Sequence, residues 1–381
     1  MRFVFIVQGE GRGHMTQAIS LFNILTQKGH EVCCVAVGIS KRRKIPDYFF
    51  EQIHCPIHPI KSPNFVTDDQ QKSILVWQTI IYNLKKIGTY YDSLKKLDQL
   101  NTHFKPDVII NFYDMLGGLY NGIYRPEARF VAIGHQYLAF HPNFKFAKGK
   151  LQKSLFLLNT RMTSWGAGKV IALSLTPYTP SATPKFLVWP PLLRGEIKEV
   201  KSTSHNFYLA YIVNPGYFSE ILSEAEKNPD LNIVAFWDQK DMPDPYRPLP
   251  NLIFHQINDR LFLEKMAACK GLLTTAGFET ICEALYLGKQ SMMVPVSGHY
   301  EQQCNALDAS LAGAGILSQN FDLHKLHHYL ATNTHKNQDG VKFKAWQHTL
   351  DKKINFFLDS LEDSGDSPAN PFPVHKKQKN Q

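Results

Sequence analysis

The sequence predicts an α/β protein built from two Rossmann-like, doubly wound domains. Short apolar runs of strand length alternate with helical patterns in both halves of the chain. A proline-rich stretch between Pro177 and Pro191 separates the two halves. The length of 381 residues is sufficient for two domains of ordinary size. We therefore predict an N-terminal domain over residues 1–178, a linker or hinge over 179–204 and a C-terminal domain over 205–345.

The composition indicates a folded protein without a membrane-spanning segment. Hydrophobic residues make up 44% of the chain and aromatic residues 12%, which argues against disorder. No apolar run reaches the roughly 20 residues that a transmembrane helix needs. The chain starts directly on an apolar strand with no cleavage site, so no signal peptide is predicted and a cytoplasmic protein is expected. Residues 363–381 are rich in Ser, Pro, Asn and Lys and are predicted to be a disordered tail.

The net charge of +9 suggests an anionic partner. A nucleotide-sugar, an acidic membrane surface and a nucleic acid would each fit that charge. No helix-turn-helix, zinc-finger or RRM signature is present, so nucleic acid is not expected. The six cysteines form no C-x-x-C pair and lie mostly in apolar segments, which favours reduced thiols.

The first element is a β-α-β unit with a glycine-rich loop. An apolar strand over 2–8 leads into GEGRGHMTQA, a helical pattern follows, and a second apolar strand covers 31–37. Such a loop suits a phosphate or another closely approaching ligand. The glycines Gly9, Gly11 and Gly13 lack the final spacing of the dinucleotide fingerprint, and no acidic residue closes the second strand. NAD binding is therefore not predicted.

Two further strands bring polar residues to the same edge of the first sheet. Strand 107–112 is followed by Asp114, and strand 129–133 is followed by His135. Ligands of open α/β sheets bind at the carboxyl ends of the strands. We expect a strand over 169–173 to complete the first domain. A Lys- and Leu-rich helix over 148–165 either lies on an anionic membrane or is an ordinary solvated face.

The C-terminal half contains the most informative stretch, residues 271–306. After expected strands over 207–213, 231–237 and 252–257, this stretch encodes two consecutive β-α units. The turn between the first strand and helix places free backbone N–H groups at a helix N-terminus, which attracts anions. Gly277 lets a phosphate approach the backbone, and the hydroxyls of Thr275 and Thr280 can donate to it. Ala276 and Phe278 complete the turn.

Three polar residues follow that turn at spacings suited to a sugar nucleotide. Glu283 lies six residues after Gly277, where a carboxylate can accept hydrogen bonds from the vicinal hydroxyls of a ribose. Glu301 and Gln302, at the next strand-to-helix turn, supply an acceptor and an amide for sugar hydroxyls. A diphosphate, a ribose and a hexose can therefore lie side by side.

These residues resemble the donor-binding signature of GT-B glycosyltransferases of families 1 and 28. The matching positions are Gly277, Glu283, Pro295, Glu301, Gln302, Asn305 and Ala306. Thr275 and Glu301 depart from the His and Asp that many family 1 members have there. The resemblance implies two domains that face each other across a cleft, and a final helix, residues 346–362, that crosses back to the first domain. It also implies that backbone groups near Ile257 contact the base of the nucleotide.

The resemblance gives the N-terminal loop a role on the acceptor side. The loop with Gly11 and Gly13 matches a G-x-G-H loop whose histidine, here His14, commonly serves as catalytic base. An imidazole titrates near working pH and can take the proton of an attacking hydroxyl; alternatively, His14 caps the helix or binds a phosphate. Asp114 would orient His14, or else cap the helix that follows it. His135 is a second candidate for the base.

The resulting expectation is an inverting, metal-independent hexosyltransferase that uses a nucleotide-sugar, with UDP as the expected nucleotide, and an acceptor hydroxyl, lipid-linked or part of a cell-envelope glycan. A location at the inner face of a membrane would follow from a lipid acceptor. The alternatives are a UDP-sugar 2-epimerase of the same fold and a non-catalytic nucleotide-sugar-binding protein. No cofactor is predicted. His324, His327 and His328 have helical spacing but no H-E-x-x-H context, so no catalytic metal is predicted.

Overall fold

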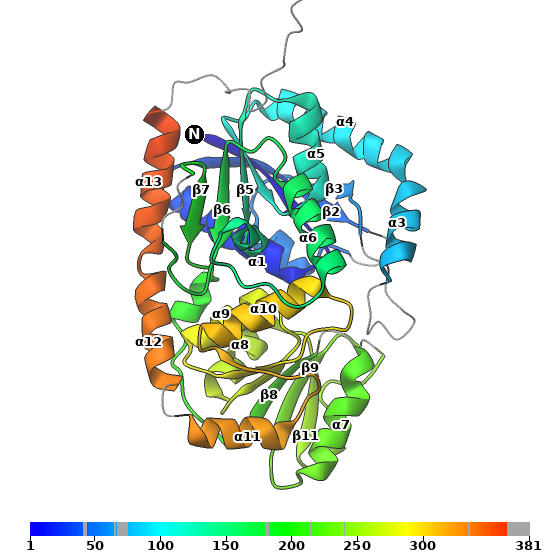
Figure 1. Cartoon of the computed structure of the whole chain (residues 1–381), viewed down its shortest axis with the longest axis vertical. Helices are drawn as coiled ribbons and strands as arrows, with labels where there is room; N and C mark the ends of the chain where they lie inside the picture. The colour runs from blue at the N-terminus through cyan, green and yellow to red at the C-terminus, as the bar shows by residue number, and fades with distance from the viewer. Residues whose placement is uncertain are drawn as a thin grey trace, which may run out of the picture.

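The computed structural model describes residues 1–40, 44–64, 66, 75–179, 183–212, 215–239, 241–333 and 336–363. They form two α/β domains stacked along the long axis of the molecule, with the N-terminal domain uppermost in Figure 1. The tail predicted to be disordered lies, apart from Asp363, outside the described residues. None of the six cysteines forms a disulfide.

The N-terminal domain is a parallel seven-stranded sheet with the order β3-β2-β1-β4-β5-β6-β7. Its central strands are buried on both faces, which is why they appear in the sequence as continuous apolar runs. The strands are β1 Arg2–Gln8, β2 Glu31–Ile39, β3 Ile57–Lys61, β4 Val108–Phe112, β5 Arg129–Gly134, β6 Lys169–Leu173 and β7 Phe186–Trp189. The helices are α1 Arg12–Gln27, α2 Asp47–Gln52, α3 Val76–Leu84, α4 Ile87–Phe104, α5 Met115–Tyr124 and α6 Lys150–Thr163, with short 3-10 helices at His135–Phe140 and Gly195–Lys198.

The sequence analysis did not predict the edge strand β3, and it also did not reveal the opposite edge strand, β7. It lies within the range assigned to the linker, and it pairs in parallel with β6 along the edge of the sheet. Four residues between proline-rich segments carry too little periodicity to be recognised as a strand.

The C-terminal domain is a second seven-stranded sheet, ordered β10-β11-β9-β8-β12-β13-β14, in which only the pairing of β10 with β11 is antiparallel. The strands are β8 Tyr208–Ile212, β9 Ile233–Trp237, β10 Tyr246–Leu249, β11 Leu252–Gln256, β12 Leu272–Thr274, β13 Ser291–Met293 and β14 Gly315–Leu317. The helices are α7 Phe218–Lys227, α8 Asp259–Ala268, α9 Phe278–Tyr286, α10 Tyr300–Leu311, α11 Leu323–Thr332, α12 Lys336–Gln347 and α13 Leu350–Asp363, with a 3-10 helix at Pro215–Tyr217. The predicted fold class, two Rossmann-like doubly wound domains, is confirmed.

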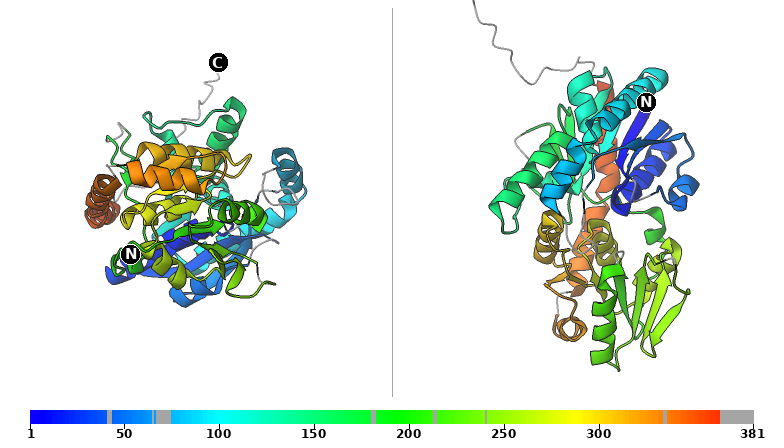
Figure 2. Two further views of the ribbon diagram at one scale, coloured as in Figure 1. Left: turned by 90° about the horizontal axis from the view of Figure 1, so that it is seen from below. Right: turned by 90° about the vertical axis from the view of Figure 1, so that its right-hand side faces the viewer.

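The last two helices connect the domains. In Figure 1 they run along the left edge of the molecule, from the C-terminal domain upward beside β7. The indole of Trp346 donates to the carbonyl oxygen of Ser174 (2.9 Å), and Phe357 packs edge-on against Trp189 with ring centroids 5.4 Å apart. In the right-hand view of Figure 2 the final helix, in red-orange, again runs upward alongside the N-terminal domain.

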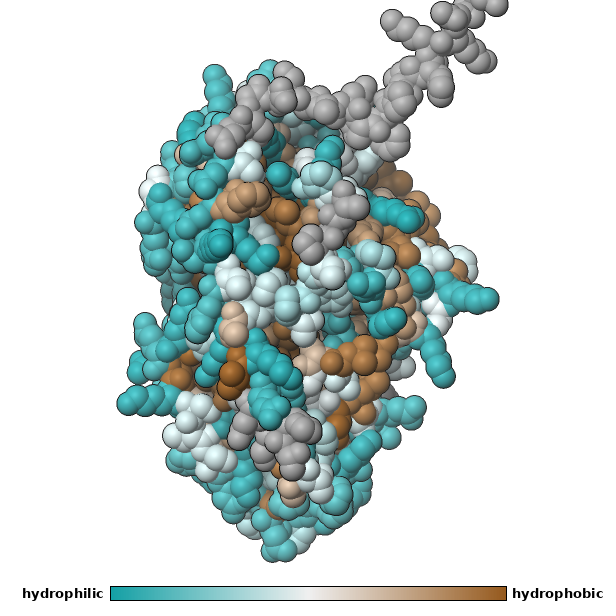
Figure 3. Space-filling model, turned by 60° about the vertical axis from the view of Figure 1, so that its left-hand side comes forward, coloured by the Kyte–Doolittle hydropathy of each residue, from teal (hydrophilic) through white to brown (hydrophobic). Residues whose placement is uncertain are grey.

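The surface differs between the two domains. In the space-filling view, hydrophobic residues gather along one edge of the upper half, whereas the lower tip is mostly hydrophilic (Figure 3). Among the described residues, no helix combines the length and the apolar character needed to cross a bilayer.

The order of strands in both sheets reverses direction at one point, between β1 and β4 and between β8 and β12. In open α/β sheets, such a switch point leaves a crevice at the carboxyl ends of the strands. The two crevices face each other, and the site lies between them.

Candidate active site

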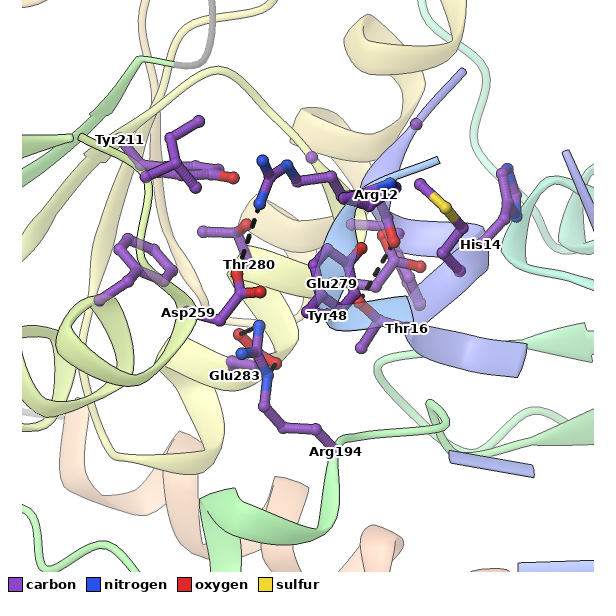
Figure 4. A pocket seen from close by; sticks show the side chains of 18 of the residues that line it. Arg12, His14, Thr16, Tyr48, Arg194, Tyr211, Asp259, Glu279, Thr280 and Glu283 are labelled. Atoms are coloured by element: carbon purple, nitrogen blue, oxygen red, sulfur yellow. Dashed lines mark hydrogen bonds and ion pairs between the residues drawn. The ribbon is translucent and has the colours of Figure 1, made fainter. Parts of the chain in front are cut away.

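A cavity of about 1850 Å³ lies between the two domains. Its upper wall is the loop from Gly9 to Thr16, and its lower wall is the turn from Thr275 to Thr280. Figure 4 shows charged side chains from both walls pointing into this space. With the exception of Asp114, every predicted site residue lines it.

Two helix N-termini open into the cavity from opposite sides. The helix α1 begins after Gly11 and α9 begins after Gly277, and neither has a side-chain cap. Free first-turn amides and the helix dipole make both termini favourable for an anion. A methyl group added at Gly277 would meet only the Thr275 carbonyl, at 3.6 Å. The glycine therefore leaves open space above the α9 terminus, where a phosphate can approach.

His14 lies in the first turn of α1 and is buried. Its ring stacks on Tyr113 with centroids 5.7 Å apart, and its Nε2 is 3.2 Å from Nε2 of Gln136, which donates. Burial lowers the pKa of His14 to about 4, so the ring is neutral at pH 7. A neutral ring whose Nε2 accepts a hydrogen bond keeps a lone pair on that atom, which is what a proton acceptor needs.

Tyr113, whose ring stacks on the ring of His14, has an unusual backbone conformation. It is one of the described non-glycine residues with a positive φ, 60°, directly after β4. Its hydroxyl is anchored by Thr160 Oγ1 (2.8 Å) and Asn159 Nδ2 (3.1 Å). A costly left-handed residue persists where its surroundings fix it, and such residues concentrate at functional sites.

Asp114 does not contact His14 in this structure. Its Oδ1 accepts from the backbone N–H of Leu116 (2.8 Å) and from the hydroxyl of Ser62 (3.1 Å), so its side chain caps α5. Burial raises the pKa of Asp114 to about 6. These contacts match the helix-capping alternative rather than the orienting role, and Tyr113 and Gln136 are the residues that position His14.

Gln136 links His14 to the donor side of the cavity. The same Nε2 group also donates to Oε1 of Glu301 (3.0 Å), a residue of α10 in the other domain. Burial raises the pKa of Glu301 to about 7. A chain of hydrogen bonds therefore runs from the candidate base to a buried acid of the C-terminal domain.

The contacts of His135 do not favour it as the catalytic base. Its ring stacks flat on Phe278 with centroids 4.3 Å apart, and its Nε2 lies 2.7 Å from Oδ1 of Asn305. Burial lowers the pKa of His135 to about 3. The contacts of His135 with two C-terminal residues indicate that it joins the domains.

Glu283 is engaged differently from the expectation. Arg194, which follows β7, donates from Nε to Oε1 (2.5 Å) and from a terminal nitrogen to Oε2 (3.2 Å) of this buried carboxylate. Glu283 still lines the cavity. Because a carboxylate has about four acceptor positions, a ribose can share it with Arg194, and the arginine then fixes its orientation.

A second set of charged residues surrounds the α1 terminus. Arg12 lies 3.5 Å from Oδ1 of Asp259 and over the ring of Tyr48. Glu279, in the first turn of α9, accepts a hydrogen bond from Gln17 of α1. A side chain at position 13 would overlap the Glu279 carboxylate, so Gly13 allows the two helices to approach.

The remaining residues that were predicted to bind the donor lie at the strand-to-helix turns that border the cavity. Thr275, Ala276 and Thr280 line the cavity beside Gly277, and Ile257 lines it directly after β11. Gln302 is fixed because its Oε1 accepts from the backbone N–H of Val296 (2.8 Å).

The sequence analysis missed Arg12, Tyr113, Gln136, Arg194 and Glu279 as site residues. Arg12, Gln136 and Glu279 are adjacent to residues that were identified, so their position at strand-to-helix turns was an available signal. Tyr113 also precedes an identified residue, Asp114, but its positive φ and the contact of Arg194 across 89 positions have no local pattern, because both depend on the folded chain.

The histidines of α11 lie outside this site. His327 Nδ1 is 2.6 Å from the hydroxyl of Tyr208, in the C-terminal sheet. Within the described ranges, no group of three or more His, Cys, Asp or Glu side chains has the geometry of a metal site.

Two facing Rossmann-like domains, with a cavity at their switch points, are the architecture of the GT-B fold. The model of glycosyl transferase family 1 matches residues 1–333. The chain belongs to that family and is a glycosyltransferase with a nucleotide-sugar donor.

The relatives agree with this assignment. An uncharacterized glycosyltransferase of Methanosarcina acetivorans is 24% identical over 337 residues, which cover 83% of this chain and 85% of that protein. The spinosyn rhamnosyltransferase SpnG, solved with thymidine diphosphate, superposes with a TM-score of 0.62 at 14% identity, over 94% of this chain and 100% of that one. SnogD from Streptomyces nogalater gives a TM-score of 0.60 at 14% identity, over 95% and 99% of the two chains. These solved structures establish the fold.

Proposed function

We propose that this protein is an inverting hexosyltransferase that moves a sugar from a UDP-sugar or TDP-sugar to an acceptor hydroxyl, with His14 as the base. The observation that carries the proposal is a buried, neutral His14 that lies across the cavity from the uncapped N-terminus of α9. UDP follows from the donor signature, and TDP is included because SpnG was solved with thymidine diphosphate.

In the proposed reaction, the acceptor oxygen bonds to the anomeric carbon while the bond from that carbon to the diphosphate oxygen breaks. The acceptor hydroxyl takes the position of the Gln136 amide as donor to His14 Nε2, and its proton passes to the imidazole. When the hydroxyl replaces it at His14, the Gln136 amide keeps its other hydrogen bond, to Glu301. Attack opposite the leaving group inverts the configuration of the anomeric carbon.

The departing diphosphate is assigned to the N-terminus of α9 and to Arg12. Free amides and a helix dipole stabilise a developing phosphate charge without reorganisation. Arg12 is close enough to contribute because it bonds to Asp259, the first residue of α8, on the same wall. The proposal therefore does not require a catalytic metal.

The acceptor is assigned to the N-terminal side of the cavity, near the loop with Gly11 and Gly13. A lipid-linked acceptor or a cell-envelope glycan would present a hydroxyl to His14 from that side. Either would place the enzyme at the cytoplasmic face of a membrane.

Calorimetry with UDP, TDP, GDP and ADP tests the donor half of the proposal. We expect one pyrimidine nucleotide to bind, and Gly277→Val to weaken it at least tenfold, because the added side chain fills the phosphate position. The matched control is Gly88→Val on α4, where an added Cβ meets nothing within 4 Å.

Binding of no pyrimidine nucleotide would overturn the proposal. If the nucleotide binds, incubation with UDP-sugars, with and without candidate acceptors, separates the remaining alternatives. An epimerised nucleotide-sugar formed without acceptor would indicate a 2-epimerase, and binding without turnover would indicate a nucleotide-sugar-binding protein.

A further inference from the structure

An apolar stripe lies exposed along α3 and the start of α4. Trp77, Ile80, Ile81 and Leu84 recur at i, i+3, i+4 and i+7, the spacing that normally faces a protein core. Here the stripe faces solvent, with 75% of Trp77 and 60% of Leu84 exposed. Ile87, at the start of α4, extends it and is 59% exposed. Scattered exposed apolar residues are ordinary, but a contiguous stripe of this kind marks an interaction surface.

A second apolar and basic surface lies on α6. Its exposed Leu151 and Leu158 accompany the exposed lysines Lys145, Lys148 and Lys150. No Asp or Glu occurs between Glu127 and Glu196, a stretch that contains six lysines and three arginines. The exposed side of α6 therefore has no acidic residue of its own segment to neutralise its lysines.

The two surfaces lie on the same side of the N-terminal domain. The helix α5 packs against both α4 and α6, and in Figure 1 all of these helices and α3 lie from the middle to the right-hand edge of the N-terminal domain. Both border the cleft: Asn83 of α3 bonds to the cavity residue Asn64 (3.2 Å), and the carbonyl oxygen of Ala147, just before α6, accepts from Tyr300 of α10 (2.8 Å).

We infer that this side, formed by α3, the start of α4 and α6, binds the surface of an anionic lipid membrane. Lys85 and Lys86 immediately follow the stripe of α3, and α3 itself carries no charge. Apolar side chains enter the interfacial zone of a bilayer, tryptophan is favoured there, and lysines pair with acidic headgroups. If the same side of a second copy of this chain packed here instead, lysines would face lysines, and no acidic groups would be present to pair with them.

Flotation of the full chain with vesicles tests this inference. The vesicles are phosphatidylcholine alone or mixed with phosphatidylglycerol. We expect binding only to the anionic vesicles and weaker binding as salt rises, because headgroup attraction is screened. The double substitution Lys148→Glu with Lys150→Glu should weaken binding about tenfold or more. Trp77→Ser with Leu84→Ser should abolish the part of the binding that survives high salt.

Val341→Ser with Phe356→Ser is the matched control, because both residues are exposed and apolar but lie on α12 and α13. This variant should bind vesicles like the parent, and all variants should keep the same nucleotide affinity, which shows that they are folded. Absence of binding to anionic vesicles, or binding unaffected by the α3 and α6 substitutions, would overturn the inference. Sedimentation velocity tests whether the chain self-associates. Self-association of the parent that is lost in Trp77→Ser with Leu84→Ser would show that the apolar stripe is a dimer interface instead.

Discussion

The two helix N-termini that face each other across the cavity share one architecture but carry opposite charges. Both α1 and α9 follow a strand that borders a switch point, begin after a glycine and lack a side-chain cap. The first turn of α1 contains Arg12 and no acidic residue, whereas the first turn of α9 contains Glu279. A cation near a helix N-terminus is unfavourable in isolation, so Arg12 indicates that an anion is expected there.

This difference in charge between the two helix N-termini suggests separate roles for the two domains. Glu279 reaches across to α1, where Gln17 and the space at Gly13 receive it. The carboxyl of Glu279 from the other domain thus lies against the first turns of α1, while the space above the α9 terminus stays open. The donor phosphates are expected at α9, and the chemistry of the acceptor at His14.

The largest effect should come from the acceptor side. His14→Ala removes the proposed base and should lower kcat about 10²- to 10⁴-fold, the usual contribution of a general base. Nucleotide affinity should stay unchanged, because the donor lies on α9. Steady-state kinetics and calorimetry on one preparation measure both quantities. Equal losses of kcat and of nucleotide affinity would show that the two termini do not have separate roles.

The next effect concerns the buried ion pair of the donor side. Arg194→Met leaves Glu283 without its partner, and such a change in a buried pair costs about 3–5 kcal/mol in the free energy of unfolding. Chemical denaturation measures it, and adding Glu283→Gln should recover much of the loss. The control is Arg260→Met, which breaks an exposed i,i+4 pair with Glu264 and should change stability by less than about 1 kcal/mol. An Arg194→Met protein as stable as the parent would contradict the buried pairing.

A smaller effect, on nucleotide affinity, is expected from substitution of Arg12, the arginine in the first turn of α1. Arg12→Met should weaken nucleoside diphosphate binding about tenfold, because it removes one charge-assisted contact. Arg247→Met, an exposed arginine on β10, should leave the affinity unchanged. Calorimetry compares the three proteins at one salt concentration. An equal affinity for all three would place the diphosphate at α9 without help from α1.

The smallest effect is a pH dependence at Glu279. Burial raises the pKa of this carboxyl from 4.5 to about 7. In the unfolded chain the group ionises at lower pH than in the folded protein, so the stability that neutral Glu279 provides is lost as the pH rises from about 4.5 through about 7. Glu279→Gln does not titrate, and should melt about 2–4 °C above the parent at pH 8 but level with it at pH 5.

Thermal melts at the two pH values measure this difference. Glu226→Gln, an exposed glutamate of α7, serves as the control and should follow the parent at both. A constant offset between Glu279→Gln and the parent would mean that the contact of Glu279 with Gln17, and not its titration, sets the stability.

The sequence by itself determined the two Rossmann-like domains, the strand-to-helix turn at Gly277 and the place of the candidate base His14 at the start of a helix. These features are local: buried parallel strands appear as apolar runs, and a β-α turn places its glycine and first-turn residues within a few positions of each other. Helical spacing fixes Glu283 relative to that turn, and Glu301 and Gln302 lie at the start of the next helix, α10.

Only the tertiary structure decided what these residues contact. Glu283 meets Arg194 across 89 positions, and Gln136 joins His14 to Glu301 across 122 and 165 positions. Asp114 caps its own helix, and Tyr113 supports the imidazole instead. Periodicity encodes which side chains are buried, but it does not encode which buried acid meets which donor, because that pairing exists only when two separately encoded domains close on each other.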